Sequence, residues 1–114
     1  MADSEFLALE RRLWLEGIDT YQQLLSPGCI MAFPAPVGLL RGAAIRKSLE
    51  GVPRWSEVTM SETLIAYPDS NTAVQAYHAI AKRPGSKRYS AYCTSTYHND
   101  GSGWRLVQHQ QTPD

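Results

Sequence analysis

The hydrophobic period of the chain changes from that of a helix to that of a strand near its midpoint. From Trp55 onward, Val58, Met60 and Leu64 alternate with polar residues, which is the period of a half-buried strand. Earlier in the chain, apolar residues recur every three to four positions, as on one face of a helix: Leu7, Trp14, Ile18, Tyr21 and Leu25, with Phe6, Leu9 and Leu13 beside them. Helices followed by strands predict an α+β domain, with helices covering one face of a sheet.

Turn residues divide these patterns into elements. Gly17 predicts a break between two N-terminal helices, with Asp19 as the N-cap of the second and residues 26–28 as their end. The apolar run 29–33 predicts a short buried strand, and Gly42 precedes a third helix over residues 43–50. Further strands are predicted from Trp55 to the turn at 68–71, and over 72–83, 88–99 and 103–111, as an antiparallel meander.

Length and charge narrow the functional classes. A chain of 114 residues fits one domain over residues 1–114. Eleven basic and eleven acidic residues give no net charge, so no nucleic-acid partner is expected, and no apolar run is long enough for a membrane partner. The chain has two cysteines and no N-terminal signal pattern, which predicts a cytoplasmic protein with free thiols. Its histidines and cysteines do not recur at the spacing of metal ligands, so neither a metal nor another cofactor is expected.

The pairing of the last three strands predicts which side chains lie beneath the helices. Four-residue hairpin loops would place Arg83 opposite Arg88 and Asn99 opposite Trp104. The face toward the helices then carries Val74, Ala76, His78 and Ile80, then Ala91, Cys93, Ser95 and Tyr97, and finally Trp104, Leu106, Gln108 and Gln110. The opposite face carries, among others, Gln75, Tyr77 and His109.

This register predicts a ligand pocket between the helices and the sheet. Its polar residues would be His78, Cys93, Ser95, Gln108 and Gln110, because buried polar groups need partners or a ligand. Its aromatic walls would be Trp14, Tyr21, Phe33, Trp55 and Tyr97. His78 is the candidate acid/base residue, since the ordinary pKa of histidine suits proton transfer near neutrality.

The order of elements and three short motifs resemble the nuclear transport factor 2-like superfamily over nearly the whole chain. The motifs are Leu24-Leu25 before Ser26-Pro27-Gly28-Cys29, the helix entry Arg41-Gly42-Ala43-Ala44-Ile45, and the last strand from Trp104, and they look like those of SnoaL-like and ketosteroid-isomerase-like members. The resemblance implies a cone-shaped, curved, mostly antiparallel sheet under three helices, a homodimer, and a pocket used by isomerases, cyclases, dehydratases or binding proteins.

The chain departs from the ketosteroid isomerase pattern at the catalytic position. In those enzymes a carboxylate before the loop proline removes a proton, whereas here that position is Phe33. Three hypotheses follow: a domain that binds a small organic ligand; an enzyme of isomerase, dehydratase or cyclase type with His78 as acid/base and Gln108 or Gln110 polarising an oxygen; and a structural homodimer with a filled core. In each, the outer sheet face is the expected dimer surface.

Overall fold

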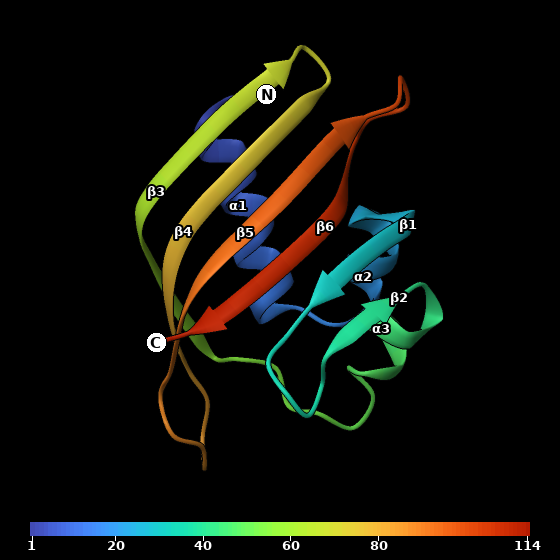
Figure 1. The fold of residues 1–114 in the computed structure, drawn as a ribbon. Coiled ribbons are helices and arrows are strands. Elements are labelled where there is room, and N and C mark those ends of the chain that lie inside the picture. The colour runs from blue at the N-terminus through green and yellow to red at the C-terminus, as the bar shows by residue number, and fades with distance from the viewer.

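The computed structural model describes residues 1–114 as three helices packed on one six-stranded sheet (Figure 1). The helices are α1 (Asp3–Leu15), α2 (Ile18–Leu24) and α3 (Ala43–Lys47). The strands are β1 (Leu25–Ala32), β2 (Leu39–Arg41), β3 (Glu57–Asp69), β4 (Thr72–Lys82), β5 (Tyr89–Asn99) and β6 (Trp104–Pro113), in the spatial order β2-β1-β6-β5-β4-β3. The β1–β6 pair is parallel and all others are antiparallel, so the predicted α+β class with a mixed sheet is confirmed.

The first half of the chain follows its turn residues, with differences at element ends. Helices α1 and α2 meet at Gly17 as predicted, but Gly17 itself is the N-cap of α2, so the prediction for Asp19 was wrong. Asp19 lies in the first turn instead, where its charge still complements the helix dipole. Strand β1 begins at Leu25, four residues before the predicted strand, and β2 was not predicted.

The predicted pairing of β4 with β5 is wrong by one residue. The last pair before the hairpin loop is Ala81 with Tyr89, rather than Arg83 with Arg88. A shift of one residue exchanges the two faces of a strand. The buried side chains of β4 are therefore its odd-numbered ones, from Ala73 to Ala81, and His78 lies on the outer face.

The pairing of β5 with β6 begins as predicted and then changes. Asn99 pairs with Trp104, but Tyr97 pairs with Leu106 while Thr96 pairs with Gln108. The extra residue is Val107, which forms a β-bulge. Beyond the bulge the faces are exchanged: His109 and Gln111 turn toward the helices, while Gln108 and Gln110, both predicted to face inward, lie on the outer face.

Helix α1 crosses the inner face of the sheet, and α2 and α3 lie beside β1 and β2 (Figure 1). The core has two parts. The first contains Phe6, Tyr97 and Leu106, and the second contains Trp14 and Tyr77 with the small residues Ala79, Ala81, Ala91 and Cys93. Small side chains on β4 and β5 leave room between the sheet and the helices.

None of the three helices is both long and apolar enough to cross a membrane.

Candidate functional site

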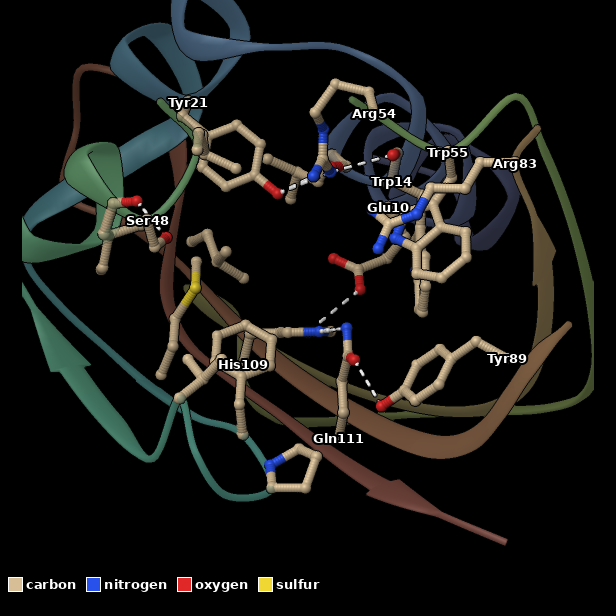
Figure 2. Close-up of a pocket in the computed structure, with 18 of the residues that line it drawn as sticks. Glu10, Trp14, Tyr21, Ser48, Arg54, Trp55, Arg83, Tyr89, His109 and Gln111 are labelled. Carbon is tan, nitrogen blue, oxygen red and sulfur yellow. Dashed lines mark hydrogen bonds and ion pairs between the residues drawn. The ribbon is translucent and has the colours of Figure 1, made fainter. Parts of the chain in front are cut away.

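A cavity of about 350 Å³ lies between the helices and the inner face of the sheet (Figure 2). Twelve of its nineteen lining residues are hydrophobic, as is typical of sites for small organic molecules. Four of the five predicted aromatic walls, Trp14, Tyr21, Phe33 and Trp55, line it. The fifth, Tyr97, is fully buried on the inner sheet face and packs in the core.

Three of the predicted polar residues lie on the other side of the sheet from this cavity. His78 approaches the Asp114 carboxylate at 3.1 Å and packs against the ring of Tyr92. Gln108 donates a hydrogen bond to Thr96 at 3.0 Å, and Gln110 accepts one from the Thr94 hydroxyl at 3.3 Å. Placing His78, Gln108 and Gln110 in the pocket was therefore wrong, because a seven-residue connection after Ala81 and the bulge at Val107 change the register.

Cys93 and Ser95 face inward as predicted, with different consequences. Burial raises the pKa of the Cys93 thiol to about 12, with a smaller contribution from the Glu10 charge, so it is not a nucleophile near neutral pH. Ser95 does not line the cavity, but its hydroxyl lies between two residues that do, Glu10 and His109.

Glu10 lies on α1 and points toward the inner face of the sheet, and only 1% of its surface is exposed. Its Oε1 accepts hydrogen bonds from Tyr77 and Ser95, both at 2.6 Å, and its Oε2 accepts one from Tyr97. The Trp14 indole N–H donates to the Tyr77 hydroxyl at 2.9 Å. Several hydroxyl donors therefore replace the water that a carboxylate loses on burial.

The two tyrosines remain protonated donors across the physiological range. Burial raises the pKa of Tyr77 and of Tyr97 well above the ordinary value, and the charge of Glu10 raises both further. The sequence contained one sign of this cluster that was missed. Glu10 is four residues after Phe6 and four before Trp14, so it lies within the apolar stripe of α1.

His109 connects the Glu10 cluster to the cavity. Its Nδ1 lies 2.7 Å from the Ser95 hydroxyl oxygen and 3.6 Å from Oε1 of Glu10. Ser95 donates its one proton to Glu10, so its oxygen accepts from Nδ1–H of His109. The proton is thus on Nδ1, and Nε2 is an acceptor that faces the Gln111 amide nitrogen at 3.0 Å.

Burial lowers the pKa of His109 from its ordinary 6.5, although the nearby Glu10 charge raises it. The imidazole is therefore neutral at pH 7. The orientation of Gln111 agrees with this assignment, because Tyr89 donates a hydrogen bond to its Oε1 at 2.9 Å and leaves its amide nitrogen toward His109. Figure 2 shows His109, Gln111 and Tyr89 joined in one chain along the cavity wall.

Arg54 lines the cavity, but its hydrogen bonds serve the fold. Its guanidinium donates to the carbonyl oxygens of Leu13 at 2.6 Å, Trp14 at 2.9 Å and Glu16 at 2.8 Å, and to the Tyr21 hydroxyl at 3.2 Å. The last carbonyls of a helix have no partner within it, and a positive charge there complements the helix dipole. Arg54 thus caps the C-terminal end of α1.

One side of the cavity is a cluster of aromatic rings. Trp55 stacks on Tyr89, with ring centroids 5.5 Å apart and planes inclined by 20°, and Trp14 packs against both. The Arg83 guanidinium covers the Trp55 ring at 4.3 Å. This arrangement offers flat apolar surfaces to a ligand, beside the polar pair His109 and Gln111.

Comparisons with known proteins support the fold and leave the function open. No protein-family model matches the chain, and no curated protein matches it. Solved structures match along its whole length. An NTF2-like protein of unknown function in nutrient uptake from Rhodospirillum rubrum has a TM-score of 0.85 at 13% identity, covering 100% of this chain and 99% of that one.

Two further structures show the same architecture. An NTF2-like protein from Cytophaga hutchinsonii has a TM-score of 0.83 at 13% identity, covering 100% of both chains. The CamKII hub homology domain of Chlamydamonas reinhardtii has a TM-score of 0.76 at 20% identity, covering 100% of this chain and 99% of that one. The chain therefore has the nuclear transport factor 2-like fold, which confirms the resemblance found in its sequence.

Proposed function

We propose that this protein binds a small, largely apolar organic molecule in the cavity between its helices and its sheet. One observation carries the proposal: a cavity of about 350 Å³ joins aromatic walls to a few polar groups, among them the hydrogen-bonded pair His109 and Gln111. Its volume is within the range of small-molecule sites, which is roughly 300–1,000 Å³. A filled core, the structural alternative, would leave no such space.

The experiment is a titration with 2-methoxynaphthalene, a flat apolar probe, followed by calorimetry and by the indole N–H resonances of Trp14 and Trp55. We expect saturable binding that shifts both resonances, because both indoles line the cavity. Leu49→Trp enlarges a lining residue and should abolish binding. Val52→Trp is the matched control, since Val52 is exposed and lies outside the cavity wall. Binding that is equally strong in both variants would contradict the proposal.

A second candidate function is acid/base catalysis, with His109 in the role first assigned to His78. The observation that favours it is the neutral imidazole whose Nδ1–H is oriented by Ser95 and Glu10, so that the basic lone pair is on Nε2, where a substrate proton could replace the hydrogen bond from Gln111. An enzyme of this kind should lose turnover in His109→Gln and keep its affinity for substrate. Retained turnover in that variant would exclude His109 as the base.

We also propose that the outer sheet face forms a homodimer. Its support is the set of large apolar side chains exposed on or beside this face: Ile30, Leu39, Leu64 and Tyr92. These side chains are spread from β2 at one edge of the sheet to β3 at the other, and a partner subunit on this face would remove them from water. A cytoplasmic location is proposed as well, because Cys29 and Cys93 are free thiols, as is usual in a reducing compartment.

A further inference from the structure

One hydrogen bond joins the polar pair of the cavity, His109 and Gln111, and a ligand group that enters between them would replace it. On His109, Nδ1–H is bonded to Ser95 and held near Glu10. On Gln111, Oε1 is bonded to Tyr89. What remains toward the cavity is an acceptor, Nε2 of His109, and a donor, the amide nitrogen of Gln111, which are now bonded to each other at 3.0 Å.

A group that enters between these two atoms must donate to one and accept from the other. A carbonyl oxygen only accepts and an ammonium only donates, so each would leave one buried group without a partner. A carboxylate only accepts and would bring a second negative charge toward the buried Glu10. A hydroxyl satisfies both partners, because it donates one hydrogen bond and accepts another.

The surroundings of the polar pair favour an aromatic ring as the carrier of that hydroxyl. The ring centroid of Phe33 lies 6.0 Å from that of His109. Tyr89, which donates a hydrogen bond to Gln111, is stacked on Trp55. Flat rings pack well against such walls. Building on the proposed function, we propose that the cavity binds a phenol-type ligand whose hydroxyl donates to Nε2 of His109 and accepts from the amide of Gln111.

The test compares 2-naphthol with its methyl ether, 2-methoxynaphthalene, by calorimetric titration at pH 7.5. The two probes share their ring system, but the ether cannot donate a hydrogen bond. We expect 2-naphthol to bind about 10-fold more tightly, since only its hydroxyl can donate to Nε2 of His109, a buried acceptor without a partner costs roughly 1–3 kcal/mol, and 1.4 kcal/mol is a factor of ten. In His109→Phe the two affinities should become equal.

Two further variants keep the test decisive if His109→Phe folds poorly. Gln111→Leu removes a donor from which both probe oxygens can accept, so it should weaken the binding of both probes, while Gln108→Leu, on the outer face of the same strand, should leave both affinities unchanged. Equal binding of both probes to the wild-type protein would overturn the hydroxyl site and leave the proposed function intact. Absence of saturable binding by either probe would overturn both.

Discussion

Glu10 shows how one buried residue can organise a site. A carboxylate without water requires several donors, and this one has three hydroxyls from β4 and β5. Replacing it removes the acceptor that Tyr77, Ser95 and Tyr97 share. The loss of stability should therefore depend on how many of the two accepting oxygens of Glu10 a substitution keeps.

For Glu10→Ala we expect the free energy of unfolding to fall by about 3–5 kcal/mol, because three buried hydroxyls lose their partner. Glu10→Gln should cost less, since its amide oxygen still accepts. Urea unfolding measures both, with Glu57→Ala at an exposed strand position as control. A loss in Glu10→Ala no larger than in this control would show that the cluster contributes nothing to stability.

His109 should make the stability of the protein depend on pH. Its pKa is lowered in the folded state by burial, despite the opposing effect of Glu10. The unfolded chain therefore takes up a proton first, so the contribution of neutral His109 is complete above about pH 6.5 and is lost as the pH falls through the folded-state pKa.

We expect the free energy of unfolding to decrease more steeply below about pH 6.5 in the wild type than in His109→Gln. Urea titrations at a series of pH values measure the slope. Gln108→Leu is the control, because it removes no titratable group and lies on the outer face of the same strand, so it should retain the wild-type slope. Equal slopes for the wild type and His109→Gln would contradict the prediction.

Gln75 is a buried amide whose oxygen and nitrogen both lack a protein partner. An unsatisfied buried polar group costs roughly 1–3 kcal/mol. Gln75→Met keeps the shape of the side chain and removes the polar atoms, so we expect a gain in unfolding free energy of about 1 kcal/mol or more. Thermal unfolding measures it, and a lower melting temperature would contradict the prediction.

At the scale of elements, Arg54 determines how α1 ends. Its guanidinium satisfies carbonyl oxygens that the helix cannot satisfy itself. Arg54→Met keeps the apolar part of the side chain and should cost about 1.5–3 kcal/mol, the range for hydrogen bonds to a charged group. Hydrogen exchange should rise first in the last turn of α1. The control is Arg46→Met on the exposed side of α3, and equal losses in both variants would argue against capping.

The elements also show how far the sequence alone could predict this structure. Their order and type follow from hydrophobic period and turn residues, and the inner face of β5 was correct because its alternation is unbroken. The faces of β4 and β6 were wrong for local reasons. The loop after Ala81 is longer than its Pro84-Gly85 turn suggests, and the bulge at Val107 has no compositional mark.

Errors of this kind affect the site more than the fold. The aromatic walls Trp14, Tyr21, Phe33 and Trp55 were predicted because large rings fill the space between helices and sheet regardless of strand register. The polar residues were not predicted correctly, because a shift of one residue in the register of β6 puts Gln108 or Gln110 in the place of His109. Glu10 could have been found as the single charge within the apolar stripe of α1.

At the scale of the whole molecule, the outer sheet face predicts association. We expect the wild-type protein to sediment as a dimer at micromolar concentration, and Tyr92→Glu to shift it to a monomer, because a charge would be buried in the interface. Val52→Glu, at an exposed position away from the sheet, should remain dimeric. A monomeric wild-type protein would contradict the prediction.

The bulge at Val107 determines which side chains at the end of β6 face the helices, so the strand has two conceivable registers. In a regular ladder Gln108 and Gln110 would lie beneath α1, whereas the bulge brings His109 there instead. The two registers differ in which polar side chains of β6 lie on the inner face. The hydrogen bond from His109 to Ser95, beside Glu10, exists in only one of them. The buried Glu10 and Ser95 thus favour the register in which the His109 imidazole faces the cavity beside Gln111.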